Sequence, residues 1–286
     1  MGFFIFTLSI IHPLQKSPIG IFDSGYGGLT VLKEIVAQLP NYDYLYLGDN
    51  ARAPYGTRSF ETVYSYTLEC VKKLFDLNCQ LVILACNTAS AKALRTIQQK
   101  DLPLIGPSKR VLGVIRPTTE IIGKSSKTGH VGVLGTNGTI TSNSYPIEIA
   151  KFFPNIVVSQ EACPMWVPLV ENGEIESEGA NYFIQKNITN LLAKDRLIDT
   201  IILGCTHYPL LQHKIKAHLP AHITLLSQGE LVAKSLREYL LRHPEIESNC
   251  SKGQEIEFYT TDSPENFDAS ASIFFGKEVS SSHLQV

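Results

Sequence analysis

The sequence lacks most of the features that define disordered, membrane-spanning or nucleic-acid-binding proteins. Only 18% of its 286 residues are charged and the net charge is −2, so there is no excess of positive charge to bind phosphates. No run of apolar residues approaches the ~20 that cross a bilayer. Hydrophobic residues make up 44% of the chain, enough for a substantial core. We therefore expect a soluble, compact protein with no membrane or nucleic-acid partner. The length favours two lobes, since one domain usually has ~100–200 residues.

The sequence also lacks paired cysteines. Its six cysteines contain no C-x-x-C spacing, which argues against a structural zinc site and against the disulfide framework of a short secreted protein. The apolar stretch at residues 3–11 has neither the basic segment before it nor the cleavage site after it that a signal peptide needs. We interpret residues 1–17 as an extension or a wrongly assigned start, and we expect reduced thiols, no metal and a cytoplasmic location.

Short β-branched runs alternate with longer amphipathic stretches along the whole chain. Several of the runs are apolar at successive positions, as in Leu81-Val82-Ile83-Leu84, which is typical of parallel strands covered by helices on both faces. Helical periodicity is seen at 29–39, 59–77, 89–99, 177–193 and 230–241. The expected strands are Ile19–Asp23, Asp43–Gly48, Gln80–Ala85, His130–Gly135, Asn155–Ser159, Asp199–Gly204, His222–Leu226 and Glu255–Thr260. The alternation predicts an α/β protein with mainly parallel, doubly wound sheets.

An imperfect internal repeat suggests that the two lobes are similar. The segment at 19–25 (IGIFDSG) aligns with 131–137 (VGVLGTN), and 81–88 (LVILACNT) aligns with 200–207 (TIILGCTH). The strands alone would be explained by the general likeness of α/β strands. The shared ending, a small residue, a cysteine and then polar residues, favours duplication into two lobes related by a pseudo-twofold axis. The chain is expected to cross between the lobes near 106–110, a GPSKR turn.

Two cysteines stand where a ligand would bind. In open α/β sheets ligands lie beyond the carboxyl ends of the strands, and Cys86 and Cys205 directly follow two expected strands. A thiol at the start of a helix has its pKa lowered by the helix dipole, so we expect both thiols to be activated. The other cysteines, Cys70, Cys79, Cys163 and Cys250, stand in ordinary contexts and are expected to be packed in the core.

Polar loops follow the neighbouring strands. The first is Asp23-Ser24-Gly25-Tyr26-Gly27-Gly28, which matches neither the G-x-G-x-x-G fingerprint nor the P-loop, so no nucleotide is implied. Its glycines would allow the backbone to approach a ligand closely. The second follows Gly48 and contains Ala53-Pro54-Tyr55-Gly56, and the third is Gly135-Thr136-Asn137-Gly138-Thr139.

Together these motifs resemble glutamate racemase, a family within the aspartate/glutamate racemase superfamily. The resemblance rests on FDSG with GGL at 22–29, APYG at 53–56, ACNTAS at 85–90, GTNGT at 135–139 and GCTHYPL at 204–210, and it extends from about Ile19 to about Phe275. It implies an isomerase that converts L-glutamate to D-glutamate for peptidoglycan without pyridoxal phosphate or any other cofactor. It also implies an active site in the cleft between the lobes.

The resemblance assigns roles to individual residues. Cys86 and Cys205 are the two bases on opposite faces of the α-carbon, Cys86 acting on D-glutamate and Cys205 on L-glutamate by analogy. The family's auxiliary residues match Asp23 near Cys86, His207 near Cys205, and Glu171. With no arginine clamp implied, small neutral donors are expected around the glutamate. The substrate-binding residues by similarity are Asp23, Ser24, Pro54, Tyr55, Gly56, Cys86, Asn87, Thr88, Thr136, Thr139, Cys205, Thr206 and His207.

The resemblance also implies a domain organisation and partners. The first lobe is expected to be discontinuous, at 18–107 plus 226–276, with the second lobe at 108–225 and a C-terminal tail at 277–286. A homodimer is implied, and activation by a peptidoglycan precursor is associated with members that carry N-terminal extensions. The chain departs from the family at that extension, at Tyr26, in the longer 107–119 region and at Ser227-Gln228-Gly229, where Asp-Ser-Gly is frequent.

Three alternatives stay open at this point. An aspartate racemase would share the two thiols, although Asp23-Ser24-Gly25 favours glutamate. A decarboxylase of the superfamily would need only one thiol. A partner-binding role, such as the topoisomerase inhibition associated with some members, would be indicated by a disabled site, whereas these motifs are intact.

Overall fold

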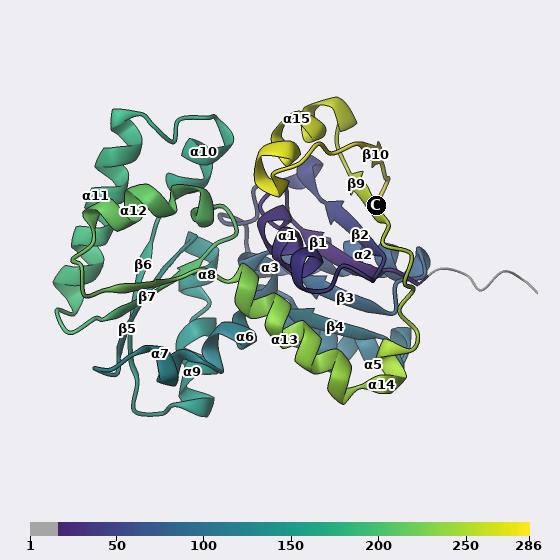
Figure 1. The fold of residues 1–286 in the computed structure, drawn as a ribbon, viewed down its shortest axis with the longest axis horizontal. Coiled ribbons are helices and arrows are strands. Elements are labelled where there is room, and N and C mark those ends of the chain that lie inside the picture. The colour runs from purple at the N-terminus through teal and green to yellow at the C-terminus, as the bar shows by residue number, and fades with distance from the viewer. Residues whose placement is uncertain (1–16) are drawn as a thin grey trace, which may run out of the picture.

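The structure of the protein is a computed structural model, and residues 17–286 are described. The expected N-terminal extension at 1–17 lies outside the described residues, apart from Ser17. Two lobes lie side by side, each with its own sheet, and α13 runs from the region between them along the first lobe (Figure 1). Among residues 17–286, none of the helices combines the length and the apolar character needed to span a bilayer.

The first lobe contains a six-stranded sheet in the order β10-β9-β2-β1-β3-β4, and all neighbouring strands are parallel. Every residue of β1, β2 and β3 is buried, as their continuous apolar runs predict. The strands are β1 (Ile19–Asp23), β2 (Tyr44–Gly48), β3 (Leu81–Leu84), β4 (Arg110–Gly113), β9 (Ile256–Thr260) and β10 (Ser281–His283).

The second lobe contains a four-stranded parallel sheet in the order β6-β5-β7-β8. Its strands are β5 (His130–Gly135), β6 (Val157–Ala162), β7 (Thr200–Gly204) and β8 (Thr224–Leu226). This order repeats the order β2-β1-β3-β4 of the first sheet, counted from the first strand of each lobe. The common order supports the duplication that the sequence repeat suggests, while the pseudo-twofold axis itself stays a prediction.

Helices cover the sheets, and several of them begin at polar caps. Ser59, Thr136 and Ser177 each accept a hydrogen bond from a backbone N–H in the first turn of the helix that follows. The first-lobe helices are η1 (Asn50–Arg52), α1 (Leu29–Gln38), α2 (Phe60–Asp76), α3 (Asn87–Lys92), α4 (Leu94–Thr96), η2 (Ile97–Asp101), α5 (Leu102–Ile105), α13 (Gly229–Arg242), α14 (Pro244–Glu247) and α15 (Pro264–Phe275). The crossing and second-lobe helices are α6 (Ile115–Thr119), α7 (Ile122–Ser125), α8 (Asn137–Thr141), α9 (Ser144–Phe152), α10 (Trp166–Glu171), α11 (Glu178–Lys194), η3 (Tyr208–Leu211) and α12 (Gln212–His218).

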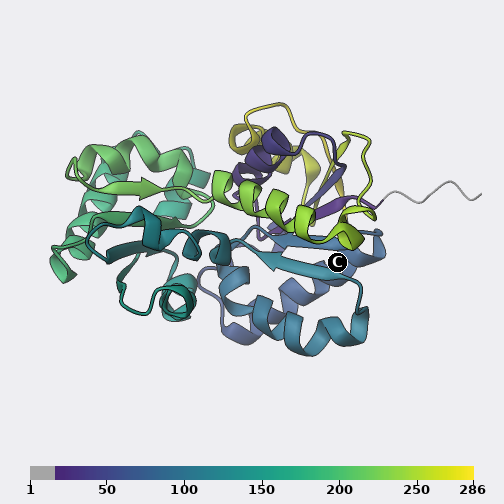
Figure 2. The ribbon, with the colours of Figure 1, turned by 60° about the horizontal axis from the view of Figure 1, so that its bottom comes forward.

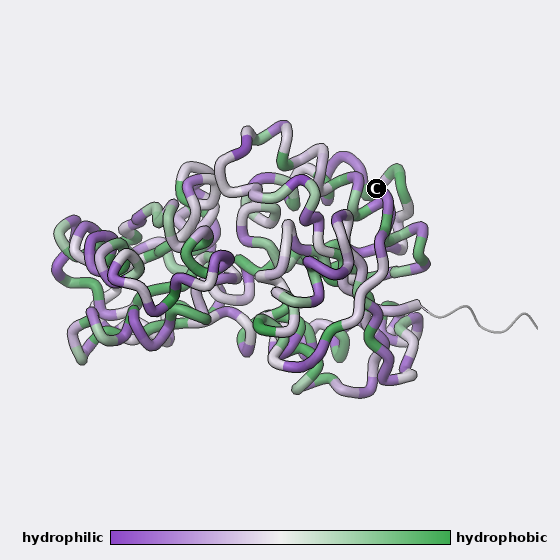
Figure 3. The backbone as a smooth tube through the Cα atoms, turned by 90° about the horizontal axis from the view of Figure 1, so that it is seen from above, coloured by the Kyte–Doolittle hydropathy of each residue, from purple (hydrophilic) through white to green (hydrophobic). Residues whose placement is uncertain are grey.

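The first sheet is packed on both faces. Ile19 and Ile21 of β1 join a core with α1 and α13, whereas Phe22 joins a separate core with α2 and α3. Figure 2 shows the purple α1 and yellow-green α13 on one side of this sheet and the blue helices on the other. Along the tube in Figure 3, apolar and hydrophilic stretches alternate in both lobes. Each large apolar side chain buried in this way contributes roughly 1.5–3 kcal/mol to stability.

Some of the expected boundaries are wrong. The 106–110 turn does not cross between lobes, because β4 pairs with β3 and keeps the chain in the first sheet to Gly113. Leu226 pairs within the second sheet, and the expected tail at 277–286 supplies β10. The helix expected at 89–99 begins at Asn87 and is broken after Lys92.

The strand expected at 155–159 lies later, at Val157–Ala162. The half-exposed β6 is at the edge of its sheet. Its second half contains the polar residues Ser159, Gln160 and Glu161, so it lacks the apolar run that predicts a buried strand. The strands β4 and β10 are absent from the sequence-based prediction. Both are short and form by pairing with a neighbour distant in the chain, which local pattern cannot indicate.

Candidate active site

A cavity of about 140 Å³ lies between the two lobes, where the carboxyl ends of β1, β3, β5 and β7 meet. This volume is below the ~300–1,000 Å³ of sites for drug-sized ligands, so the cavity suits a small molecule. The residues expected from the sequence that line it are Ser24, Pro54, Tyr55, Gly56, Cys86, Asn87, Thr88, Thr136, Glu171, Cys205, Thr206 and His207. Two expected residues, Asp23 and Thr139, lie behind this wall in contact with lining residues.

Cys86 lies between β3 and α3 and is the N-cap of that helix. Its sulfur accepts a hydrogen bond from the Ala89 backbone N–H at 3.4 Å and lies 3.5 Å from the Ser24 hydroxyl. The expected lowering of the thiol pKa is wrong here, since burial raises the pKa of Cys86 to about 12. The carboxylate of Asp23 adds to this rise, and the hydrogen bonds from Ser24 and Ala89 only partly offset it. Desolvation therefore outweighs the helix N-terminus, and the protonated thiol is favoured.

Cys205 follows β7 in the second lobe and is 6% exposed. Unlike Cys86 it does not cap an α-helix, because a turn and the short η3, which begins at Tyr208 and contains Pro209, follow it. Its sulfur lies 3.9 Å from Nδ1 of His207. The expectation that both thiols begin helices is thus confirmed for Cys86 and wrong for Cys205, whose local electrostatic partner is a histidine.

His207 links Cys205 to Glu171. Nε2 of the ring is 2.9 Å from Oε1 of Glu171, at the end of α10, and the ring lies edge-on to Phe274 with the centroids 5.1 Å apart. Burial disfavours the charged ring, but hydrogen bonds to Cys205 and Glu171 outweigh burial and raise the pKa of His207 to about 10. The imidazolium at neutral pH can therefore stabilise negative charge on the sulfur of Cys205.

Asp23 ends β1 and is 1% exposed. One carboxylate oxygen accepts from the Gly25 backbone N–H at 2.9 Å, and the other accepts from the Thr206 hydroxyl at 3.5 Å. Burial raises its pKa to about 6, against opposing contributions from His207 and the backbone donors. A carboxyl group with a pKa near neutrality, close to both thiol loops, can exchange a proton under working conditions.

Three hydroxyls join the lobes at the cavity. Thr88 of α3 lies 2.9 Å from Thr136 and 3.4 Å from Thr139, and these two threonines of the second lobe are 3.2 Å apart. Thr136 also caps α8 by accepting from the backbone N–H of Thr139. Hydroxyls can donate to a carboxylate without adding charge. Within residues 17–286, no lysine or arginine is among the residues that line the cavity.

Asn87 lines the cavity, but its side-chain amide is engaged elsewhere. Its Nδ2 donates to Oε1 of Gln228 at 2.6 Å, and its Oδ1 accepts from the Tyr145 hydroxyl at 2.7 Å. Gln228 in turn donates to Tyr145, to the Val114 carbonyl and to Thr118. The network joins the two segments that connect the lobes, one at Val114 and the other at Gln228. It also fixes the side chain of Asn87, the residue after Cys86.

The glycine turn after β1 has a use that sequence analysis missed. A Cβ atom at Gly27 would lie 2.2 Å from Oγ1 of Thr206 and 2.5 Å from Nδ1 of His207. The absence of a side chain at this position therefore lets the two lobes approach each other closely, rather than only admitting a ligand.

Sequence reasoning also missed part of the cavity wall. The residues concerned are Gly25, Ala53, Thr57, Asn137, Cys163, Pro164, Val167 and Pro168. The last four lie before or on α10, where a buried Trp166 and two prolines give a purely structural pattern. Cys163, expected in the core, is fully buried and yet borders the cavity. In the described residues no group of three or more histidine, cysteine or acidic side chains could hold a metal ion.

Comparisons with known proteins agree with this geometry. The model of the Asp/Glu/hydantoin racemase family matches residues 19–236. A glutamate racemase from Sulfurihydrogenibium is 40% identical over 260 residues, which are 91% of this chain and 94% of that protein.

Solved structures are similar over nearly the whole chain. A glutamate racemase isoform from Bacillus anthracis gives a TM-score of 0.86 at 35% identity, covering 95% of this chain and 98% of that one. The Francisella tularensis glutamate racemase in complex with D-glutamate gives 0.83 at 33% identity, covering 95% and 97%. The Escherichia coli glutamate racemase with L-glutamate and the activator UDP-MurNAc-ala gives 0.73 at 25% identity, covering 93% and 97%.

Proposed function

Because the chain belongs to the Asp/Glu/hydantoin racemase family, we propose that its cavity interconverts L- and D-glutamate, with Cys86 and Cys205 as the two bases. It is an amino-acid racemase of a family that works without pyridoxal phosphate, and its D-glutamate serves peptidoglycan synthesis. The observation that carries the assignment of the bases is the placement of the two thiols. Cys86 follows β3 of the first lobe, Cys205 follows β7 of the second lobe, and both border the same small cavity.

Racemisation requires a proton to leave one face of the α-carbon and another to arrive on the opposite face. In the L-to-D direction the thiolate of Cys205 takes the α-proton, and the resulting carbanion takes a proton from the thiol of Cys86. Protonated His207, 3.9 Å from Cys205, stabilises the thiolate before the transfer. The high pKa of Cys86, about 12, favours the protonated donor.

The reverse direction begins with the opposite arrangement of protons. Cys86 must then be a thiolate, and Asp23 is the carboxyl group whose charge acts most strongly on it. With a pKa of about 6, Asp23 can hold a proton or release it near neutrality. The assignment of Cys86 to D-glutamate rests on the family analogy.

The substrate is bound by small neutral donors. Thr88, Thr136 and Thr206 line the cavity and can supply hydroxyl donors, and Ser24 and Gly56 line it beside them. Hydroxyl and N–H donors can bind both carboxylates of glutamate and stabilise the negative charge that develops in the transition state. Asn87 contributes chiefly by holding the start of α3, because its amide is already bonded to Gln228 and Tyr145.

A coupled assay of the purified protein with each enantiomer of glutamate and aspartate tests the substrate. We expect both glutamate enantiomers to be converted at comparable kcat/KM and both aspartate enantiomers at least about 100-fold more slowly, since a shorter chain cannot satisfy both carboxylate sites. Preference for aspartate would instead support the alternative racemase.

We also propose a homodimer, activation by a peptidoglycan precursor, and a cytoplasmic location. The E. coli glutamate racemase structure contains the activator UDP-MurNAc-ala, which supports the second proposal. All six cysteines are free thiols, as is usual in a reducing compartment. Sedimentation, assays with and without UDP-MurNAc-Ala, and cell fractionation test the three proposals separately.

A further inference from the structure

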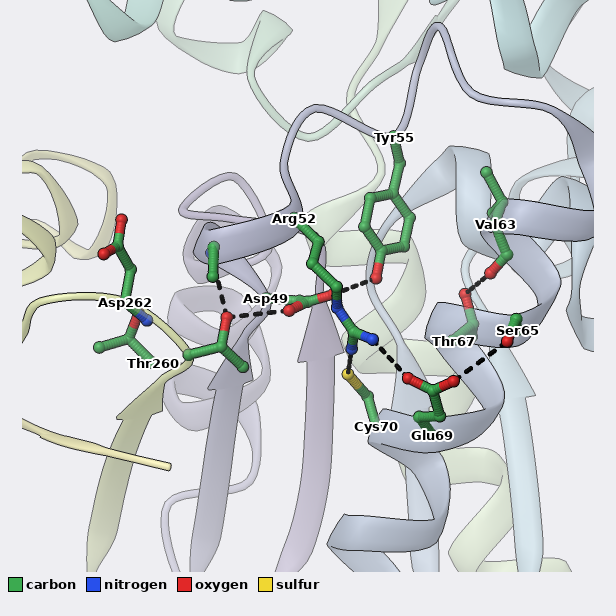
Figure 4. A network of polar contacts seen from close by, with 12 residues as sticks. Asp49, Arg52, Tyr55, Val63, Ser65, Thr67, Glu69, Cys70, Thr260 and Asp262 are labelled. Atoms are coloured by element: carbon green, nitrogen blue, oxygen red, sulfur yellow. Dashed lines mark hydrogen bonds and ion pairs between the residues drawn. The ribbon is translucent and has the colours of Figure 1, made fainter. Parts of the chain in front are cut away.

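The loop after β2 has one side at the cavity and the other side in the first lobe. Residues 53–57 line the cavity, whereas Asp49, at the start of this loop, is completely buried away from it. Figure 4 shows the side chains that gather around Asp49. The proposed function assigns no role to Asp49 or to its neighbour Arg52.

The carboxylate of Asp49 is held by three side-chain donors. Oδ2 accepts from Nε of Arg52 at 2.7 Å and from the hydroxyl of Tyr55 (Figure 4). Oδ1 accepts from the hydroxyl of Thr261 at 2.8 Å. The backbone N–H of Asp49 donates to the carbonyl of Asp23 at 3.0 Å. A buried carboxylate is stable only with such partners, so its geometry is narrowly fixed.

Arg52 is fixed in turn by α2. Its guanidinium pairs with Glu69, lies 3.3 Å from the sulfur of Cys70, and covers the ring of Tyr66 at 4.3 Å from the centroid. The position of the Asp49 carboxylate is therefore tied to the helix beside it through Arg52, by a half-exposed pair with Glu69 and by the contacts with Cys70 and Tyr66.

Tyr55 is held through its hydroxyl. The side chain is 1% exposed and packs against Phe22 and Tyr66. Burial, with the charges of Cys70 and Asp49, raises the pKa of Tyr55 far above its usual range, so the hydroxyl stays protonated and donates to Asp49. The hydroxyl is thus not available to glutamate, and the polar atoms with which Tyr55 can serve the cavity are those of its backbone.

The far end of the loop contacts the second lobe. The carbonyl of Gly56 accepts from the backbone N–H of Gly138 at 2.8 Å, in α8. A Cβ atom at Gly56 would lie 3.0 Å from Cβ of Thr136, so the backbone is already in close contact with that side chain. A small shift of Tyr55 would therefore move both the backbone at the cavity wall and the contact between the lobes.

We propose that Asp49 is a positioning residue for racemisation: it holds Tyr55, and through it the 54–56 backbone, in the place where that backbone binds the substrate. This inference rests on the proposed function. Because the backbone contacts would serve the bound substrate and the transition state alike, losing their alignment should raise KM more than it lowers kcat.

The test is Asp49→Asn with Asp43→Asn as a matched control. Asparagine has one acceptor oxygen, so it cannot satisfy donors on both sides as the carboxylate does. Asp43 is also buried, at 4% exposure, and accepts from the backbone N–H groups of Gly253 and Glu255 at the opposite end of β2. Both variants replace a buried carboxyl group next to β2, but only Asp49 adjoins the loop that lines the cavity.

We expect Asp49→Asn to raise KM for both glutamate enantiomers about 10- to 100-fold, with kcat within about 3-fold, as for a lost charge-assisted hydrogen bond. Asp43→Asn should leave KM within about 2-fold at a temperature where circular dichroism shows both variants folded. A merely structural role would reduce the active fraction, and with it the measured kcat, without raising KM. Equal KM values in the two variants would overturn the inference.

Tyr55→Phe tests the same contact if Asp49→Asn fails to fold. This variant removes one oxygen and should raise KM about 10-fold. Where both single variants fold, the double variant should have no higher KM than Asp49→Asn alone, because both act through one hydrogen bond. Additive increases in KM in the double variant, or an unchanged KM in Tyr55→Phe, would count against the positioning role of Asp49. A wild-type protein inactive on glutamate would overturn the proposed function and this inference with it, whereas an active wild type beside an unaffected Asp49→Asn overturns the inference alone.

Discussion

The ring nitrogen Nε2 of His207 lies 2.9 Å from a carboxylate oxygen of Glu171, although the two residues are far apart in the sequence. The contact leaves Nδ1 facing the sulfur of Cys205 at 3.9 Å. A carboxylate behind an imidazole orients the ring and favours its charged form. The second lobe thus provides a cation for one thiol, whereas the thiol of the first lobe has only neutral donors, Ser24 and a backbone N–H.

Glu171→Gln should shift the alkaline limit of activity. Protonated His207 is lost as the pH rises through its pKa of about 10. Without the charge of Glu171 this pKa falls, so kcat/KM for L-glutamate should decline about one pH unit or more earlier. Glu176→Gln is the matched control, because Glu176 pairs with His213 on the exposed surface. A pH–rate profile with the same alkaline limit in both variants would contradict the role assigned to Glu171.

Cys86→Ala and Cys205→Ala should each lower racemisation by at least about 1,000-fold, since removing either base leaves one face of the carbon without a proton donor or acceptor. Cys250→Ala changes a buried thiol outside the cavity and should keep near-normal turnover. Polarimetry on folded variants provides the measurement. Normal activity in either of the first two would refute the two-base assignment.

Solvent hydrogen should appear in the product. In deuterated water, D-glutamate formed from L-glutamate should carry α-deuterium in nearly every molecule, because the donor thiol exchanges with solvent and the abstracting thiol is on the other face. Mass spectrometry of product formed early in the reaction measures this. Retention of the original proton would indicate a single base that returns it.

Asp23→Asn should stabilise the protein while impairing catalysis. The folded-state pKa of Asp23 is raised to about 6, so the folded protein binds a proton more tightly than the unfolded chain and loses stability as the pH rises from about 4 to 6. The neutral amide avoids this loss. At pH 8 the free energy of unfolding should therefore rise by about 1–3 kcal/mol, and the difference from wild type should shrink at pH 4.

Urea unfolding at the two pH values checks this stability prediction, with the exposed Asp76→Asn as a control that should change little. Activity of Asp23→Asn should fall by about 100-fold or more, as expected for a lost proton-transfer group. A variant that is less stable than wild type at pH 8 would show that the burial of Asp23 is fully compensated by its hydrogen bonds.

Gln228→Leu should destabilise the junction of the lobes. The change removes the acceptor of the buried Asn87 amide N–H and one of the hydrogen bonds of the Tyr145 hydroxyl, although Asn87 and Tyr145 still bond to each other. It should lower the free energy of unfolding by about 1–3 kcal/mol, the cost of an unsatisfied buried polar group. Gln38→Leu removes a partly exposed glutamine whose hydrogen bond to the Glu230 carbonyl of α13 lies at the surface, and it should cost under about 0.5 kcal/mol. Denaturant titration distinguishes them, and equal stability would mean that the Gln228 network is replaceable by packing.

The sequence by itself determined the α/β class, the bounds of β1 and β5, and the two cysteines that follow strands. These features depend on local pattern: a buried parallel strand needs a continuous apolar run, and a turn needs glycine and small polar residues. The resemblance carried by the same motifs added the identity of the racemase family, and most of the site residues that it implied line one cavity, with Asp23 and Thr139 behind its wall.

Only the tertiary structure decided the charges and the long-range contacts. The pKa of Cys86 is raised because the thiol is buried, which overrides the helix position that the sequence indicates. The approach of Glu171 to His207, the pairing of β4 with β3, and the hydrogen bond of Tyr55 to Asp49 each join groups that no local pattern connects. Desolvation and pairing between distant segments are properties of the packed chain, so they exist only once both lobes have folded around the cavity.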